Sequence, residues 1–183
     1  FVGDLRVPKS VSVGGPAESQ GAAVLINLGL IALFGVQHSI MARPTIKKGW
    51  TQWVPQPIER STYVLISSAL LILMYWAWQP MPVQIWNVSG TFLGISLWAL
   101  FFLGMGVVLA SSFMINHFDL FGLRQTFLHF QERPYQSVPF KVTGFYKWVR
   151  HPLMLGFLLS FWAAPVMTTG RLLFAAGMTA YIF

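Results

Sequence analysis

The sequence contains no cysteine, so a disulfide, a cysteine-ligated metal site and a cysteine nucleophile are all excluded within this chain. Charged residues are also scarce, at 9% of the 183 residues, against about 25% in a typical soluble domain. Hydrophobic residues make up 55%. Because so few ionic groups cannot cover a surface in water, the composition predicts an integral membrane protein that has the lipid bilayer as its partner.

Several motifs of soluble enzymes are missing as well. The chain has no Walker phosphate loop, no GxGxxG turn and no GxSxG elbow of a serine hydrolase. Its four histidines form neither an HxH nor an HExxH pair, so we expect no metal site, even with Asp119 nearby. The net charge of +7 does not indicate a nucleic-acid partner, because the basic residues cluster between apolar segments.

Long apolar segments predict an all-α fold, a polytopic bundle of transmembrane helices. Crossing about 30 Å of hydrocarbon takes roughly 20 helical residues, and the backbone must satisfy its own hydrogen bonds there. The segments expected to cross are residues 21–41, 62–79, 89–115 and 152–169, with a further span beginning at residues 171–183. Since the sequence begins with Phe1 and its last apolar segment stops at Phe183, we expect that both natural termini lie beyond it.

Basic residues are concentrated in two predicted loops, residues 42–61 and 116–151. The first loop holds four and the second five of the twelve Lys and Arg residues, whereas the loop around residues 80–88 carries no charge. Because loops rich in Lys and Arg remain in the cytoplasm, we expect both basic loops on that side of the membrane. Residues 1–20 and 168–171 then face outward.

Polar side chains at the ends of the apolar segments are functional candidates, because such groups are costly in hydrocarbon. They form three groups: Gln37 with His38, Asn116 with His117 and Asp119, and Arg150 with His151. All three fall on the predicted cytoplasmic side, and this convergence leaves two interpretations open, a shared site and separate anchoring of each histidine at the interface. If the third helix continues past residue 115, His117, Phe121 and Arg124 share one face at i, i+4, i+7 spacing.

The segment "GFYKWVRHPLMLGF", residues 144–157, places a cation and an imidazole directly before an apolar helix. Pro152 suits the first helical turn, because its missing N–H would have no partner there. The free N–H groups and the positive dipole at that helix end favour an anion, and Arg150 adds a guanidinium fork for a carboxylate. A small zwitterion that bears a carboxylate therefore fits this corner.

These residues carry a family resemblance. "YKWVRHPLMLG" resembles the RHPxYxG element of the isoprenylcysteine carboxyl methyltransferase superfamily, whose members bind S-adenosylmethionine at the cytoplasmic ends of membrane helices. "VQHSIMARPTIKKGWTQWVPQPIERSTYVLISSALLILMYWAWQPMP" and "INHFDLFGLRQTF" resemble the bacterial methanethiol S-methyltransferase family. The resemblance covers essentially residues 1–183 as one methyltransferase domain. It implies a bacterial inner-membrane enzyme with a cytoplasmic cofactor-binding face, which methylates methanethiol to dimethyl sulfide and releases S-adenosylhomocysteine.

The resemblance also implies roles for particular residues. Met154 replaces the tyrosine of the family element, so a hydrogen bond from that position is missing. His117, with a hydrogen bond to Asp119, is the first candidate for the base that accepts the thiol proton, and His38 is the second. Phe113, Phe118 and Phe121 would line a dry substrate pocket. The residues expected on the cofactor side are Tyr146, Arg150, His151, Pro152, Gly156, Arg124 and Gln125.

Two other interpretations remain open from the sequence. A membrane methyltransferase of this superfamily could act on a larger lipophilic substrate, either a prenylcysteine carboxylate or a phospholipid amine, through a lateral opening between helices. Alternatively, the chain is a non-enzymatic membrane protein, in which the phenylalanines only pack or face lipid. The sequence indicates no obligate protein partner under any of these interpretations.

Overall fold

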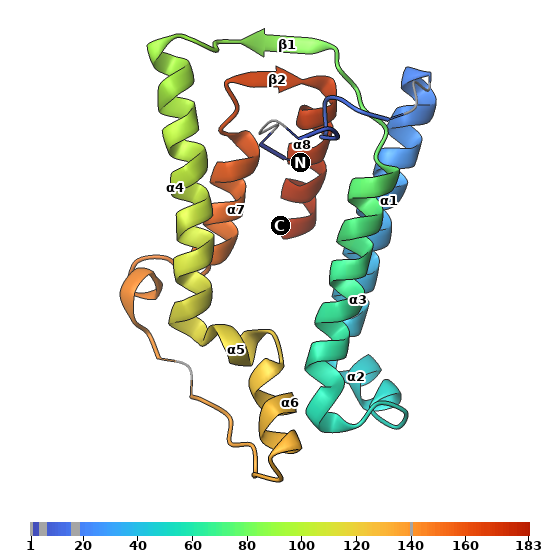
Figure 1. Ribbon diagram of the computed structural model, residues 1–183, viewed down its shortest axis with the longest axis vertical. Coiled ribbons are helices and arrows are strands. Elements are labelled where there is room, and N and C mark those ends of the chain that lie inside the picture. Colours follow the sequence, from blue (N-terminus) through green and yellow to red (C-terminus); the bar gives the residue numbers. More distant parts are fainter. Residues whose placement is uncertain (1, 4–6, 16–18, 140) are drawn as a thin grey trace.

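The computed structural model describes residues 2–3, 7–15, 19–139 and 141–183 (Figure 1). It confirms a mostly helical fold and adds a small antiparallel sheet of two strands, which the sequence did not predict. The elements in chain order are α1 (Gln20–Met41), α2 (Pro44–Trp50), α3 (Gln56–Ala77), β1 (Gln84–Asn87), α4 (Phe92–Ile115), α5 (His117–Leu120), α6 (Leu123–Phe130), the 3₁₀ helix η1 (Gly144–Lys147), α7 (Pro152–Trp162), β2 (Val166–Thr168) and α8 (Thr169–Ile182).

Within the described residues, three helices, α1, α3 and α4, are long and apolar enough to cross a membrane. They contain 22, 22 and 24 residues and run along the long axis of the molecule, with α1 beside α3 and α4 on the other side (Figure 1). Only 17% of the most apolar stretch of each helix is buried within the protein. The remaining apolar surface of these helices is therefore available to lipid.

The segment predicted to cross the membrane at residues 152–169 is corrected by the structure. Its helix, α7, has 11 residues and ends at Trp162, so at 1.5 Å per residue it is roughly 16 Å long, about half of the hydrocarbon thickness. Pro165 follows three residues later and disfavours helix in the residue before it. The chain then forms β2, which pairs with β1, and α8 begins at Thr169 instead of Arg171.

Side chains from four helices form the main core. Phe34 of α1 and Trp78, which caps the end of α3, belong to it together with Phe161 of α7 and Phe174 of α8. The N-terminal segment joins this core at the end that carries the sheet, because Trp78 donates its indole N–H to the carbonyl of Val11 at 3.2 Å. This packing fixes the upper end of the bundle and positions α7 and α8 between α1 and α4 (Figure 1).

The contact between α4 and α7 depends on two glycines. A Cβ at Gly104 would lie 2.5 Å from Oγ of Ser160 and 2.7 Å from the carbonyl oxygen of Gly156, and a Cβ at Gly156 would lie 2.7 Å from the carbonyl oxygen of Gly104. The two backbones can therefore approach only without side chains at these positions. Gly106, two residues further along α4, has open space around its Cβ position instead.

At the opposite end from the sheet, α4 does not continue past Ile115. Asn116 has a φ of 91° and accepts a hydrogen bond on its side-chain oxygen from the backbone N–H of Asp119, so it ends α4 and begins the short α5. Gly122, with a φ of 77°, makes a second break before α6. The prediction of one continuous helical face through His117, Phe121 and Arg124 is therefore wrong, because both breaks need left-handed backbone.

Candidate functional site

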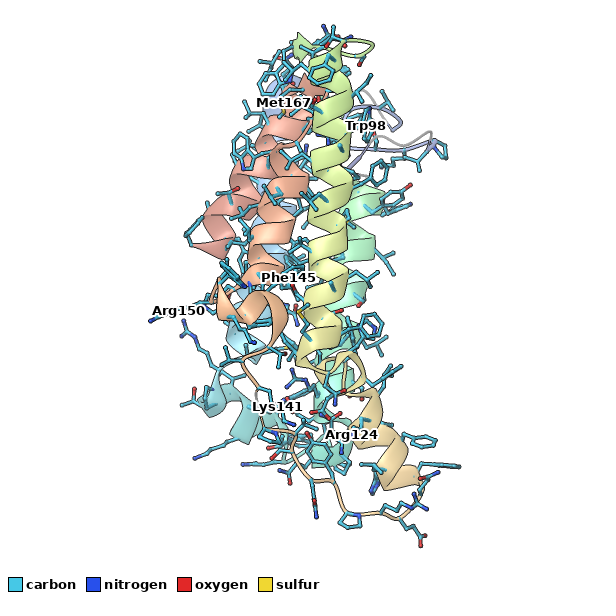
Figure 2. The ribbon with its side chains drawn as sticks, turned by 90° about the vertical axis from the view of Figure 1, so that its left-hand side faces the viewer. Trp98, Arg124, Lys141, Phe145, Arg150 and Met167 are labelled. Carbon is cyan, nitrogen blue, oxygen red and sulfur yellow. The ribbon has the colours of Figure 1, made fainter. Side chains whose placement is uncertain are left out.

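The polar groups predicted from the sequence lie towards the end of the molecule where α4, α5 and α6 meet. Figure 2 shows Arg124 and Lys141 at this lower end and Arg150 above them, whereas Trp98 and Met167 lie near the opposite end. The helices α2 and α6, which carry further basic residues, also lie at the lower end (Figure 1). The basic side chains are thus concentrated at one end of the bundle.

Three phenylalanines surround the imidazole of His117. The ring of Phe113 stacks on it with a centroid distance of 4.5 Å and an interplanar angle of 11°. Phe121 lies at 4.7 Å in a tilted arrangement, and Phe118 meets the ring edge-on at 5.7 Å. The structure therefore gathers around His117 the three phenylalanines that the sequence analysis assigned to a substrate pocket.

Ser112 is the hydrogen-bond partner of His117, which sequence reasoning missed. Its Oγ lies 2.9 Å from Nδ1 of His117, and its hydroxyl also donates to the carbonyl of Leu109 at 2.7 Å. Ser112 is 5% exposed and lies in the last two turns of α4. The break at Asn116 turns the chain so that His117 reaches back to this serine, and the spacing of five residues does not indicate such a contact.

A pocket of about 260 Å³ lies beside His117. Residues 113–118, from the end of α4 and the start of α5, form one part of its lining, and Val138, Pro139 and Lys141 form another. The lining thus combines aromatic rings, one imidazole and one ammonium group. Such a pocket can hold a small, mainly apolar molecule close to a histidine nitrogen.

Asp119 does not pair with His117, although this hydrogen bond was expected. One carboxylate oxygen accepts a hydrogen bond from the hydroxyl of Tyr135 at 3.0 Å, and the other lies 3.6 Å from the guanidinium of Arg124. That guanidinium is 5.7 Å from the centre of the Tyr135 ring. Gln125 donates to the backbone carbonyl of Asp119 at 3.2 Å and to the Tyr135 hydroxyl at 3.4 Å.

This Tyr135 cluster, formed by Asp119, Arg124, Gln125 and Tyr135, connects α5 and α6 to the segment that precedes Val138. Burial, followed by the hydrogen bond to Asp119, raises the pKa of Tyr135 above its ordinary value, so its hydroxyl stays a donor at neutral pH. The segment after Tyr135 supplies Val138, Pro139 and Lys141 to the pocket. The cluster therefore helps to hold one wall of the pocket, and Arg124 and Gln125 take part in it.

The start of α7 presents the residues predicted to hold an anion. Arg150 and His151 are exposed, Pro152 is buried at the first turn, and His151 caps α7 without a side-chain hydrogen bond. The first intrahelical bond runs from the N–H of Leu155 to the carbonyl of His151. Among the residues 2–3, 7–15, 19–139 and 141–183, the earlier N–H groups of the helix therefore have no backbone partner, as the sequence analysis expected.

Two other residues predicted on the cofactor side differ in environment. Gly156 is buried in the contact with Gly104, so its position is explained by helix packing. Tyr146 lies in η1, and burial raises the pKa of its hydroxyl. The same short helix begins at Gly144, where a Cβ would lie 2.6 Å from the methyl carbon of Met114. Because Met114 also lines the pocket, it connects the approach to α7 with the pocket of His117.

His38 occupies a separate polar group between α1, α3 and α8. Its Nδ1 lies 3.2 Å from Oγ of Ser67, and its ring contacts those of Tyr63 at 5.0 Å and Tyr181 at 6.1 Å. Among the described residues, no hydrogen bond or ring contact joins His38 to His117. The structure therefore gives the two histidine candidates different neighbours.

Together, the three long apolar helices fit an integral membrane protein, and the end of the molecule with the polar groups carries a pocket that His117 lines. The NnrU protein family matches residues 25–181 of this chain. No solved structure matches it.

Named relatives match the chain over its full length. It is 53% identical to methanethiol S-methyltransferase of Mycobacterium tuberculosis, 51% identical to methanethiol S-methyltransferase 2 of Bradyrhizobium diazoefficiens and 48% identical to methanethiol S-methyltransferase of Crocosphaera subtropica. Each match covers 100% of this chain, and 74%, 70% and 71% of the respective relative. The chain therefore belongs to the NnrU protein family and to the family of methanethiol S-methyltransferases, which confirms the resemblance seen in the sequence.

Proposed function

We propose that this chain transfers a methyl group from S-adenosylmethionine to methanethiol, with dimethyl sulfide and S-adenosylhomocysteine as the products. The observation that carries the proposal is the identity of about half of all residues to relatives that are named for this reaction, over the whole chain. The pocket beside His117 supplies a site of suitable chemistry at the end of the molecule where the polar candidates gather.

The pocket is the proposed site of the thiol. Methanethiol has only two heavy atoms, a sulfur and a methyl carbon, so the thiol needs little space. A pocket of about 260 Å³ accepts it beside Phe113 and Phe118 and leaves room for the group that donates the methyl. The aromatic rings offer an apolar surface to the methyl group of the thiol.

The start of α7 is the proposed site for the carboxylate of S-adenosylmethionine. The residues present fit this group, because Arg150 makes no ion pair within the described part of the chain and the first N–H groups of α7 have no side-chain cap. A guanidinium and free helical N–H groups both favour a carboxylate. When bound, S-adenosylmethionine supplies a methyl group on a positively charged sulfur, which is the electrophile of the reaction.

His117 is the proposed base. Nε2 of His117 would take the thiol proton, and the thiol sulfur would accept the methyl group that bound S-adenosylmethionine would supply, with S-adenosylhomocysteine as the leaving group. Nε2 is suited to this role because Nδ1 is engaged by Ser112, while Nε2 has no hydrogen-bond partner among the described residues. Alignment of the reacting atoms by the pocket walls contributes the remaining rate enhancement.

The end of the molecule with the pocket is proposed to face the cytoplasm of a bacterial inner membrane. Support comes from the basic side chains of α2, α6 and the segment up to Arg150, which lie towards this end (Figures 1 and 2). We expect a membrane-impermeant thiol reagent to label a cysteine at Gln84, in β1, in intact cells, but not a cysteine at Gln136. Equal labelling of both positions would contradict this orientation.

The proposed reaction is tested with purified protein in lipid nanodiscs. Incubation with methanethiol and S-adenosylmethionine that carries a deuterated methyl group should release dimethyl sulfide with three deuterium atoms into the headspace. A prenylcysteine and a phospholipid amine are offered in parallel as the larger substrates. Label found only in one of these larger molecules would replace methanethiol as the substrate, and absence of transfer to all three would overturn the proposal.

A further inference from the structure

The hydrogen bonds around Ser112 determine where its proton points. The carbonyl oxygen of Leu109 can only accept, so the hydroxyl of Ser112 must donate its single proton there, at an O···O distance of 2.7 Å. The same Oγ lies 2.9 Å from Nδ1 of His117. Because the hydroxyl has no second proton, its oxygen is the acceptor in that contact and Nδ1 is the donor.

From this direction we infer that Ser112 is a positioning residue, which holds His117 in the tautomer with the proton on Nδ1 and the free lone pair on Nε2. A neutral imidazole has one N–H and one acceptor nitrogen, and the bond made by one nitrogen sets the state of the other. The catalytic meaning of this inference rests on the proposed function, in which Nε2 takes the thiol proton.

Two features of the chain hold this arrangement in place. Ser112 is almost fully buried within α4, where its own bond to Leu109 restrains its hydroxyl. The left-handed Asn116 turns His117 back towards the helix, and the stacked ring of Phe113 restricts rotation of the imidazole out of its plane. The imidazole therefore meets a fixed acceptor on Nδ1, and its Nε2 is left for a molecule in the pocket.

Ser111 provides a matched control for Ser112. It is the preceding residue of the same helix, it is 0% exposed, and its Oγ has no hydrogen-bond partner in the part of the chain that the structure describes. Replacement of either serine by alanine removes one buried hydroxyl from α4. Only the replacement of Ser112 removes the acceptor for Nδ1, so a difference between the two variants reports on this hydrogen bond and not on packing.

The tautomer is measured directly by ¹⁵N NMR on protein with labelled histidine, at a pH where His117 is neutral, with its signals assigned by their loss in His117→Gln. The wild type should show a protonated Nδ1 and an unprotonated Nε2. Ser112→Ala should change this pattern to a mixture of tautomers, while Ser111→Ala should leave it unchanged. A wild-type spectrum with the proton on Nε2, or a Ser112→Ala spectrum identical to wild type, overturns the inference.

Single-turnover methylation with saturating S-adenosylmethionine tests the consequence for catalysis. Ser112→Ala should slow the reaction by roughly 5- to 20-fold, as expected for one lost hydrogen bond, and Ser112→Thr, which keeps a hydroxyl, should restore most of the rate. In a His117→Gln background, Ser112→Ala should have no further effect. An unchanged rate in folded Ser112→Ala overturns the positioning role. If the wild type forms no thioether, the proposed function fails, and the NMR result still decides the tautomer.

Discussion

Helix α4 meets its neighbours in two different ways along its length. Around Gly104 it lies directly against α7, and the contact consists of backbone, small side chains and no charged group. Beyond Ser112 the helix ends at the left-handed Asn116, and the short helix α5 follows. This end of α4 borders a pocket that is lined by aromatic and basic side chains. The middle of α4 thus packs closely against α7, whereas its end at Ser112 and beyond borders an open pocket.

The difference separates positions that maintain the fold from positions that are available for chemistry. Close packing explains Gly104 and Gly156 completely, since any side chain there meets backbone atoms. Packing does not explain an imidazole that stacks on Phe113, with one nitrogen bonded to Ser112 and the other without a partner among the described residues. Substitutions at the helix contact should therefore change the stability of the protein, and substitutions beside the pocket should change the methyl-transfer rate.

The largest effect is expected at the helix contact. Gly104→Leu would place carbon atoms within 3 Å of Ser160 and Gly156, so it should destabilise the protein by at least about 3 kcal/mol, at or above the usual range for an overpacked core. Gly106→Leu is the matched control, because nothing lies within 4 Å of its Cβ position. The yield of monodisperse protein in detergent and its thermal unfolding distinguish the two. Equal stability of both variants would refute the close contact between α4 and α7.

The next effect concerns catalysis without loss of folding. His117→Ala should lower the methyl-transfer rate by roughly 10²–10⁴-fold, as for loss of a general base, while the affinity for S-adenosylmethionine changes little. Higher pH should recover part of the rate, because the solution then supplies more thiolate. His129→Ala serves as the control, since His129 is exposed on α6. A wild-type rate at neutral pH in His117→Ala would transfer the role of base to His38.

A smaller loss is expected at the start of α7. Arg150→Ala removes a charge-assisted hydrogen bond worth roughly 1.5–3 kcal/mol, so the affinity for S-adenosylmethionine should fall about 10- to 100-fold. Arg150→Lys should restore only part of it, because a point charge lacks the fork of the guanidinium. Isothermal titration calorimetry gives the affinities, with the exposed Arg133→Ala as a control for net charge. Unchanged binding in Arg150→Ala would leave Arg150 as a membrane anchor.

The smallest effect should come from the wall of the pocket. Tyr135→Phe keeps the ring beside Arg124 but removes the hydroxyl that bonds to Asp119. A single hydrogen bond contributes about 1 kcal/mol, and Tyr135 is 41% exposed, so we expect the KM for the thiol to rise by no more than about 5-fold. Asp119→Asn combined with Tyr135→Phe should be less than additive. Fully additive effects would mean that the two residues act independently.

The sequence predicted the long helices well because their apolar residues form uninterrupted stretches of sufficient length. It failed at residues 152–169, where apolar character continues but Pro165 and the pairing of β2 with β1 end the helix after 11 residues. A hydropathy pattern contains no information about a partner strand that lies about 80 residues earlier in the chain.

The site was predictable to a similar extent. Its phenylalanines and His117 lie close together in the sequence, so their association required only local structure. The partner of His117 was expected to be Asp119, two residues further along the chain; the left-handed Asn116 instead directs His117 to Ser112 and leaves Asp119 to Tyr135 and Arg124. An asparagine tolerates this conformation without requiring it, so the break could not be inferred from residue type alone.

The shortness of α7 has a consequence for the surrounding membrane. Its 11 residues present an apolar surface, including exposed Met154, Leu155 and Trp162, that is about half as tall as the bilayer interior. Lipid that touches this surface must thin locally or tilt its chains, at a cost of fractions of a kcal/mol per ångström of mismatch. Acyl-chain length thereby becomes a variable that acts on the helix that Arg150 and His151 precede, and a thin bilayer is the medium that this face of the protein matches.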